Sequence, residues 1–541
     1  MARLTRPALL LPLCFALGLL FDVLLWDQRW GISFTLFIMA AAGLGLWQAA
    51  RLKLQPARRS WWLLAAALGF AAVSAVRTEP YTLLFTRGFS ILMLMLFAAD
   101  LLAGQWLHYR FSDFFVKLAG LVPAGWMAAG DYKAAGRGKQ QAPRPWVPVL
   151  RGLLLAVPVL LVLAALLASA DVYFGNWLTG LLSFLQIERL PEYIARLVLV
   201  SIIALAVYGA YTYAFLRSSA GAAKDAVVKP FIGFTEALVV LVSVAVLLAS
   251  FVVFQFQHFF GGAENIIGPD GYTTYAEYAR RGFTELCMVA VIVLVLFILL
   301  SSLGRRTPSQ QRYFSGLGAA LFALVAVVLV SAFQRLLLYE QAYGFTSMRL
   351  LPHIFMVWLG ILLLALVVME LTGRQRSFAA AVLLAAAGFV ATLPILNLDA
   401  YSARANIAHG LQTAPQNSRE QVVDHSYLAS LSPDAVPALV EGFLSQQAAG
   451  NHKLAQQLAA ALACIAYLHD GYGAAWQDWA LARQIAFRQG WRDWTLARQQ
   501  AAAAWQHVQA QPGFPSVSVA GDSVLVATVD GVEYLCNSHG W

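Results

Sequence analysis

The chain has 541 residues, of which 60% are hydrophobic and only 12% are charged, and its mean hydropathy is +0.66. Soluble globular domains carry roughly 45–50% apolar and about 25% charged residues. So few charged side chains cannot cover a water-soluble particle of this length. The composition therefore predicts a multi-pass membrane protein and argues against a soluble enzyme, a nucleic-acid-binding protein and a disordered scaffold.

Eleven apolar runs approach the length of about 20 residues that a helix needs to cross a hydrocarbon core about 30 Å thick. In chain order they are Ala8–Trp26, Ile32–Ala50, Trp61–Val76, Tyr81–Ala103, Val149–Ala170, Leu197–Leu216, Phe231–Phe256, Phe283–Leu303, Phe314–Leu337, Ile354–Leu371 and Phe378–Leu396. Each must be helical within lipid, because no water is there to bond its backbone groups. The first run contains Asp22 and lacks a clear cleavage site, so we read it as an uncleaved helix and not as a signal peptide.

The distribution of Lys and Arg predicts the orientation, because basic loop residues stay on the cytoplasmic side. With a cytoplasmic N-terminus, the inside segments hold twenty Lys and Arg, and the outside loops before the tail hold seven. Eleven crossings then place the C-terminal tail in the periplasm. From Asp399 onward there are seven basic and eleven acidic residues, so the net charge of +9 arises in the membrane part. The basic balance indicates cytoplasmic loops beside anionic lipid and not a nucleic-acid surface.

Four segments follow from these patterns. They are an N-terminal four-helix membrane segment (1–104), a cytoplasmic amphipathic and basic linker (105–148), a seven-helix membrane core (149–397) and a periplasmic C-terminal domain (398–541). The predicted fold class is an all-α polytopic membrane protein with about eleven transmembrane helices. Its extramembrane C-terminal domain should be helical and should end in a small antiparallel β meander.

The tail shows ordinary globular signals. Helices are expected from Ser432 to about Gln446, over Lys453–Leu468, over about Ala474–Gln489 and over Trp491–Ala510. Strands are expected at Ser516–Val519, Ser523–Val529 and Val532–Cys536, joined by the turn pairs Gly521-Asp522 and Asp530-Gly531.

Five tryptophans lie in the predicted helices of this tail: Trp476, Trp479, Trp491, Trp494 and Trp505. One interpretation is a surface that stacks on sugars or rests on the outer leaflet. The other is a core of helical hairpins, which the i, i+3 spacing of the first two pairs favours.

The tail also contains two of the four cysteines, Cys464 and Cys536. A periplasmic location is oxidising and would allow them to pair, although the compartment alone leaves pairing and two free thiols equally open. The nine histidines are scattered, and neither Cys-x-x-Cys nor His-x-x-x-His spacing occurs. No metal and no other cofactor is therefore expected.

Ionisable residues in membrane spans are candidates for function, because their burial is costly. The richest group lies near the outer ends of the eighth to tenth spans and gives five candidate ligand-binding residues: Arg281, Glu285, Arg335, Glu340 and Arg349. They would line a polar vestibule open to the periplasm, where arginines suit a phosphate or a carboxylate. The alternative is that charges at helix ends reach water and pair with one another for assembly. Almost nothing ionisable falls at mid-depth, which weighs against an ion-coupled transporter.

Four stretches of the sequence resemble a known family. They are Tyr275–Leu286 (YAEYARRGFTEL), Tyr339–Arg349 (YEQAYGFTSMR), Asn397–Asn406 (NLDAYSARAN) and Tyr427–Leu439 (YLASLSPDAVPAL). The chain is similar through them to an uncharacterised group of bacterial multi-pass membrane proteins, catalogued as a domain of unknown function (the 4173/4153 group). The resemblance covers most of the chain from about Pro148 to Phe443. It implies a bacterial inner-membrane protein and the same order of spans, and it implies no activity, cofactor or catalytic residue.

The sequence thus favours a structural, regulatory or ligand-binding component of the inner membrane. Its expected partners are membrane lipids and a periplasmic or membrane protein, and no nucleic acid. A transporter or lipid flippase is one alternative. A membrane enzyme acting on a lipid-linked substrate is another, with Glu285 and Glu340 as the nearest acid and base candidates. No catalytic motif supports an enzyme, so catalysis stays open and is not favoured.

Overall fold

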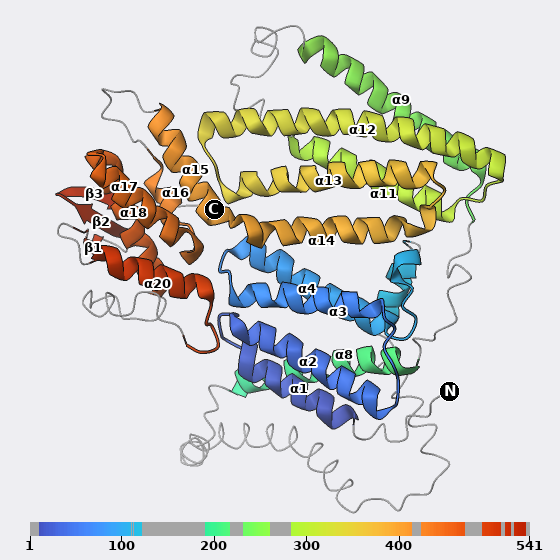
Figure 1. Ribbon diagram of the computed structural model, residues 1–541, viewed down its shortest axis with the longest axis horizontal. Coiled ribbons are helices and arrows are strands. Elements are labelled where there is room, and N and C mark those ends of the chain that lie inside the picture. Colours follow the sequence, from blue (N-terminus) through green and yellow to red (C-terminus); the bar gives the residue numbers. More distant parts are fainter. Residues whose placement is uncertain are drawn as a thin grey trace, which may run out of the picture. The chain divides into compact units, whose positions relative to one another are not determined.

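The computed structural model describes residues 10–109, 111, 113–121, 190–216, 231–259, 283–413, 423–470, 490–509, 514, 516–520 and 524–536. Over these residues the chain is mostly helical and ends in a small sheet (Figure 1). It divides into two compact units. The first consists of Met1–Asp27 and Gly120–Arg217, and the second of Gln28–Ala119 and Ser218–Trp541.

In the first unit, α1 (Leu10–Leu25) packs against α8 (Leu190–Leu216). Gly18 permits a close approach, because a Cβ atom there would lie 2.5 Å from the carbonyl oxygen of Val200. Arg196 donates two hydrogen bonds to the Asp22 carboxylate, at 2.9 and 2.7 Å. This two-pronged ion pair satisfies the one acid of α1.

The second unit contains the other apolar helices among the described residues. They are α2 (Ile32–Arg51), α3 (Ser60–Ala72) with a 3-10 turn at Val73–Ala75, α4 (Pro80–Asp100), α9 (Phe234–Phe259), α11 (Phe283–Leu303), α12 (Pro308–Tyr343), α13 (Ser347–Leu371) and α14 (Phe378–Leu396). Consecutive helices α11 to α14 pack side by side, as do α3 and α4, and α14 also packs on α4 (Figure 1). Phe297 of α11 is fully buried and its ring contacts those of Phe314, Phe322 and Phe378. Aromatic packing therefore fills the core between α11, α12 and the start of α14.

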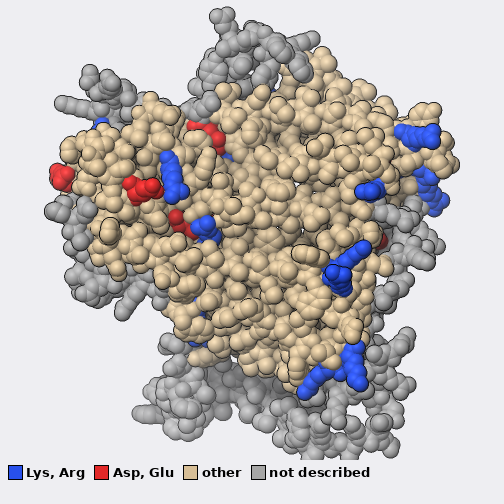
Figure 2. Space-filling view, viewed as in Figure 1, with Lys and Arg blue, Asp and Glu red and all other residues tan. Residues whose placement is uncertain are grey.

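Eight described helices are long and apolar enough to cross a membrane, namely α2, α4, α8, α9, α11, α12, α13 and α14. The helices α1 and α3 are apolar but shorter. Ten of the eleven predicted spans coincide with a described helix, and Val149–Ala170 lies outside the described residues. Over α12 to α14, Figure 2 shows a wide surface without charge along the middle of the helices. The chain is a multi-pass membrane protein.

One span is much longer than its apolar run. The helix α12 has 36 residues, which is about 54 Å at 1.5 Å per residue. It begins before the apolar run because Thr307 and Gln310 form a capping box around Pro308. It ends at Gly344, whose φ of 74° only glycine adopts easily. The polar ends of this helix are set by capping, which hydropathy does not detect.

Over its described residues, the C-terminal domain, Leu398–Leu535, contains five helices and the sheet. Its elements are α15 (Leu398–Thr413), α16 (His425–Ala429), a 3-10 turn (Pro433–Ala435), α17 (Val436–Ala448), α18 (His452–Asp470), α20 (Leu496–Gln509), β1 (Ser516–Ala520), β2 (Val524–Val529) and β3 (Val532–Leu535). The strands form an antiparallel sheet in the order β1-β2-β3. Asp530 and Gly531 both have positive φ, as a two-residue hairpin turn requires. The core surrounds α18, where Leu458, Leu462 and Ile465 are fully buried.

Two features of this domain differ from expectation. The helices α15 and α16 were not predicted, because α15 follows α14 directly after Asn397 and has no continuous apolar face. The predicted helix at Trp491 begins only at Leu496, because the Thr495 hydroxyl accepts a hydrogen bond from Arg498 N and marks the start of α20. Trp491 is consequently 60% exposed, so the core interpretation is wrong for it, whereas Trp505 is buried. Trp476 and Trp479 lie outside the described residues.

Candidate functional site

Three of the five predicted site residues lie on α12 and α13, in the halves of these helices that the α12–α13 turn connects. Arg335 and Glu340 lie near the end of α12 and are 9% and 3% exposed. Arg349 lies in the first turn of α13 and is half-buried. Glu285 is exposed in the first turn of α11, and Arg281 lies outside the described residues.

Glu340 is paired with a residue that was not among the five. Its Oε1 lies 3.1 Å from Nδ1 of His353 on α13, and the two side chains are 4% and 11% exposed. Phe333 packs edge-on against the imidazole, with the ring centroids 4.6 Å apart. Nε2 of His353 is buried and has no hydrogen-bond partner among the residues that the structure describes. This pair ties α12 to α13 beside their connecting turn.

Arg349 holds the turn itself. Its guanidinium donates to the carbonyl oxygens of Tyr343 at 2.9 Å and Gly344 at 2.6 Å, and it lies 4.3 Å over the Tyr339 ring. A cation on the last carbonyls of a helix is favoured by the helix dipole. These contacts are those of a residue that caps α12.

A larger polar cluster, which the sequence did not predict, connects the C-terminal domain to the membrane helices. Its first part is Asp434, whose side chain is fully buried. The carboxylate accepts hydrogen bonds from Thr78 N and Thr78 Oγ1, both at 2.6 Å, from Glu79 N at 3.0 Å and from Arg77 at 3.3 Å. Arg77 also donates twice to the carbonyl oxygen of Pro394, at 3.0 and 2.7 Å. The α3–α4 loop, α14 and the C-terminal domain are thereby fixed together.

The second part of the cluster lies at the start of α13. Asp399 accepts hydrogen bonds from Ser347 Oγ at 2.8 Å and from Ser432 N at 2.9 Å. The hydroxyl of Tyr427 accepts one from Ser347 N at 3.0 Å. The amide of Asn406 accepts from Phe345 N at 2.9 Å and donates to Phe345 O at 2.6 Å. We call the residues of both parts the docking network: Arg77, Thr78, Glu79, Phe345, Ser347, Asp399, Asn406, Tyr427, Ser432 and Asp434.

The acids of the docking network are strongly desolvated. Burial raises the pKa of Asp399, against the hydrogen bonds from Ser432 and Ser347. Burial also raises the pKa of Glu79, and the neighbouring charge of Asp399 raises it further. Glu79 accepts hydrogen bonds from Tyr81 N and Thr82 N at the start of α4. The free N–H groups and the positive dipole end of this helix therefore offset part of the cost of burial.

A third connection uses backbone atoms alone. Ile32 N donates to Trp494 O at 3.0 Å and Ser33 N to Arg492 O at 3.2 Å, which caps the start of α2. Ala497 N donates to Val76 O at 3.0 Å, just after α3. The C-terminal domain is thus bonded to one end of each of five helices, α2, α3, α4, α13 and α14, the last through Asn397, whose side-chain amide donates to Asp434 O at 3.5 Å. We call these the domain ends of the helices.

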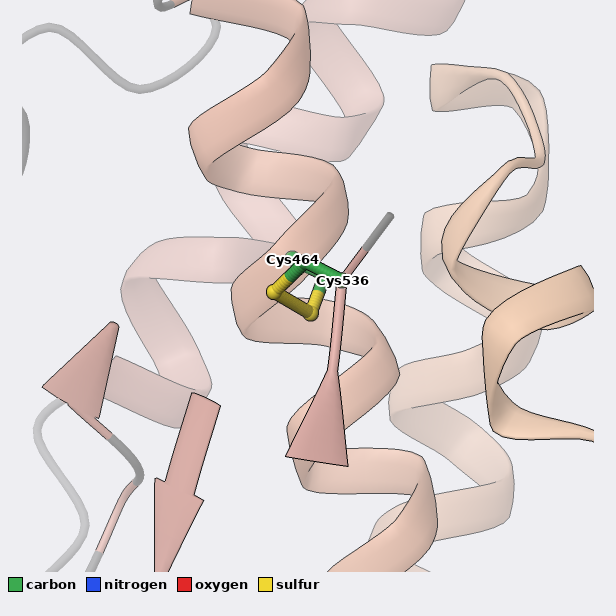
Figure 3. The surroundings of a disulfide bond; sticks show 2 residues. All are labelled: Cys464 and Cys536. Carbon is green, nitrogen blue, oxygen red and sulfur yellow. A yellow bond between two sulfur atoms is a disulfide. The ribbon is translucent and has the colours of Figure 1, made fainter. Parts of the chain in front are cut away.

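Within the domain, a disulfide joins α18 to the residue after β3 (Figure 3). It links Cys464 and Cys536, with the sulfur atoms 2.08 Å apart and the Cα atoms 5.2 Å apart. The two residues are 72 positions apart. Closing a loop of that length stabilises a fold by about 4 kcal/mol in the chain-entropy treatment.

The chemistry of the docking network is that of attachment. Its carboxylates and amide meet backbone N–H groups, hydroxyls and a guanidinium at hydrogen-bond distance. Among the described residues, no group of three or more His, Cys, Asp or Glu is placed to hold a metal ion. The hydrogen bonds therefore hold the C-terminal domain against the ends of the membrane helices.

The sequence contained a signal for this network. Three of the four stretches that carry the family resemblance meet here: Tyr339–Arg349 supplies Phe345 and Ser347, Asn397–Asn406 supplies Asp399 and Asn406, and Tyr427–Leu439 supplies Tyr427, Ser432 and Asp434. Their common place in the fold could not be read from the chain. Most of the remaining stretch, Tyr275–Leu286, lies outside the described residues.

Among known families, one has a model that matches most of the chain. A family model described as a domain of unknown function (DUF4153) matches residues 8–442. The match contains both sides of the docking network, from Arg77 to Asp434. No curated protein and no solved structure matches the chain.

Proposed function

The chain belongs to the DUF4153 family, a domain of unknown function, and we propose that it is a regulatory or scaffolding component of a bacterial inner membrane. In this proposal the C-terminal domain lies in the periplasm and binds a protein partner there. The docking network carries the proposal, above all the buried Asp434 with its four hydrogen bonds to the α3–α4 loop. A domain attached to five helix ends transmits a change at its surface to the membrane helices.

Two observations support the periplasmic orientation. The domain ends of α2, α3, α4, α13 and α14 must share one side of the membrane, because all bond the same domain. The opposite ends carry Arg51 at the end of α2 and Arg374 after α13, with Arg305 and Arg306 nearby between α11 and α12, and are rich in basic side chains (Figure 2). Basic residues favour the cytoplasmic side. A disulfide in the C-terminal domain is also typical of an oxidising compartment.

Chain topology supports eleven crossings. The start of α9 is bonded to the end of α11, since Phe231 N donates to Leu303 O and Arg305 N to Ile232 O. Both therefore lie at the cytoplasmic side, where α4 also ends. If α8 crosses the membrane, one further crossing between Asp100 and Leu190 is required. In this proposal Val149–Ala170 supplies it.

The predicted vestibule remains the ligand-binding part of the proposal. Arg335 and Glu340 are buried near the α12–α13 turn, and Phe345 of that turn is bonded to Asn406 of the C-terminal domain. A phosphate or carboxylate bound by Arg281, Glu285, Arg335, Glu340 and Arg349 would thus act next to the docking network.

Recovery of a partner tests the proposed function. The full-length protein is cross-linked in its own cells and purified in mild detergent, as wild type, as Asp434→Ala and as Glu441→Gln. Glu441 forms a surface pair with Arg404, the two side chains being 72% and 64% exposed, and serves as the matched control. We expect a stoichiometric protein partner with the wild type and the control, and its loss with Asp434→Ala at normal membrane levels.

Two results would contradict this function. One is a stoichiometric lipid-linked saccharide or metabolite without any protein partner, which would favour the flippase or the enzyme. The other is equal recovery of the partner by all three proteins, which would show that partner binding does not depend on the docking network.

A further inference from the structure

The segment Gly490–Ala497 is held where two membrane helices end. Its carbonyls at Arg492 and Trp494 cap the first turn of α2, and Ala497 N bonds Val76 just beyond α3. A backbone fixed at the ends of two apolar helices lies at the depth where the hydrocarbon of the bilayer begins. We call this segment the interfacial loop.

The interfacial loop exposes a large aromatic side chain at that depth. Trp491 is 60% exposed, and Leu496, which follows in the first turn of α20, is 38% exposed. Trp30, next to the capped turn of α2, is 36% exposed and stacks on Phe34. Tryptophan prefers the membrane–water interface, because its ring is apolar and its N–H is polar. A single exposed apolar side chain is common on protein surfaces and needs no explanation. Trp491, however, lies in a loop bonded to the end of a membrane helix, where the bilayer interface can cover it.

The charges of the interfacial loop complete the pattern. Arg492 is partly exposed, and its guanidinium lies 5.4 Å from the centroid of the Trp491 ring. The one acid of the loop, Asp493, is paired with Arg498 at 3.0 Å, and the side chains are 19% and 9% exposed. The acid is thus neutralised within the domain, and an aromatic ring and a cation face outward. This combination suits an anionic phospholipid headgroup.

We propose that Trp491 inserts into the interfacial layer of the leaflet on the domain side, with Arg492 against the phosphates of anionic lipid. The bilayer then holds the C-terminal domain at the interfacial loop, in addition to the docking network. This inference goes beyond the proposed function, since it concerns a lipid surface and holds whether or not a protein partner exists.

Photocrosslinking in a defined bilayer tests the proposal. The full-length protein with Trp491→p-benzoylphenylalanine is placed in nanodiscs that contain phosphatidylglycerol, irradiated and analysed by intact mass. The control is the same residue at Val532, the 49% exposed first residue of β3, a strand that lies on the side of the domain away from the membrane helices (Figure 1). We expect about tenfold more phospholipid adduct at 491 than at 532, since an interfacial side chain contacts lipid continuously. Equal adducts at both positions, or adducts of 491 only to protein, would overturn the proposal.

The charge of the lipid is tested separately with the same protein. Replacing phosphatidylglycerol by phosphatidylcholine should reduce the adduct at 491 several-fold, and Arg492→Gln should remove this dependence on lipid charge. Unchanged dependence in Arg492→Gln would overturn the role of the arginine. Hydrogen exchange at Ile32 and Ser33 shows whether each variant keeps the interfacial loop in place.

Discussion

The carboxylate of Asp434 meets donors that lie more than 350 positions earlier in the chain. The sequence Ser432-Pro433-Asp434 predicts a local helix start, and a helical turn does begin at Pro433, but the Ser432 side chain caps nothing. The long-range pairing could not be predicted, because Arg77 and Asp434 are each unremarkable in their own loops. Glu340 was predicted from its depth in a span, whereas its partner His353 follows only from the packing of α13 on α12.

Removal of the Asp434 carboxylate should loosen the attachment of the domain. Asp434→Ala leaves Arg77, Thr78 N and Glu79 N without their buried acceptor, at a cost of about 3 kcal/mol. We expect a lower Tm in detergent and faster hydrogen exchange at Thr78 and Glu79. Asp434→Asn, which keeps one acceptor oxygen, should lose less. An unchanged Tm together with unchanged exchange in Asp434→Ala would contradict the assigned role.

The raised pKa of Asp399 predicts the sign of a pH effect. Because burial disfavours its charged form, the folded protein binds this proton more tightly than the unfolded chain does. Protonated Asp399 therefore contributes its full stabilisation below the unfolded pKa of about 4. This stabilisation is lost as the pH rises through the raised pKa of Asp399 in the folded protein. The Tm of the wild type should therefore fall over that window relative to the Tm of Asp399→Asn. A constant difference in Tm across the window would show that Asp399 does not titrate this way.

At the scale of elements, apolar runs predicted the membrane helices well, because burial in lipid requires length and low polarity and little else. The ends of helices were predicted less well, since caps and contacts decide them. Thus α12 extends to its capping box at Thr307, and α20 is shortened to Leu496. The start of α2 is determined by residues outside the helix. Gly31 provides no side-chain cap, and the carbonyls of the interfacial loop take its place.

Gly31 is required by this close approach. A Cβ atom there would lie 2.5 Å from Trp494 O and 2.6 Å from the carbonyl carbon of Asp493, and neither is a flexible side-chain atom. Gly31→Ala should displace the interfacial loop and speed hydrogen exchange at Ile32, Ser33 and Ala497. Gly43→Ala is the matched control, because nothing lies within 4 Å of the added atom in the same helix. It should be neutral or slightly stabilising, as alanine favours helix over glycine. The same exchange rates in both variants would contradict the capping role.

At the scale of the whole protein, the chain is a multi-pass helical membrane protein of the DUF4153 family whose C-terminal domain is bonded to five helix ends. Two arginines on the domain side, Arg77 and Arg349, donate to the backbone carbonyls of Pro394, Tyr343 and Gly344. Lys and Arg are expected to be rare on this side of the membrane. The hydrogen bonds to these carbonyls explain why the two arginines occur there. The attachment of the domain is the basis for a regulatory or scaffolding role.

The most direct test of this account is disulfide trapping in intact cells with Thr78→Cys and Asp434→Cys in one full-length chain. The two native side chains are hydrogen-bonded at 2.6 Å, so cysteines there can pair, and the rest of the docking network holds the domain in place. A protease site inserted between residues 122 and 148 separates the two positions after cleavage. We expect the fragments to stay joined without reducing agent and to separate with it, whereas Thr78→Cys with Glu441→Cys gives separate fragments. Fragments that separate without reducing agent in the first pair, even after an added oxidant, would contradict the docked domain.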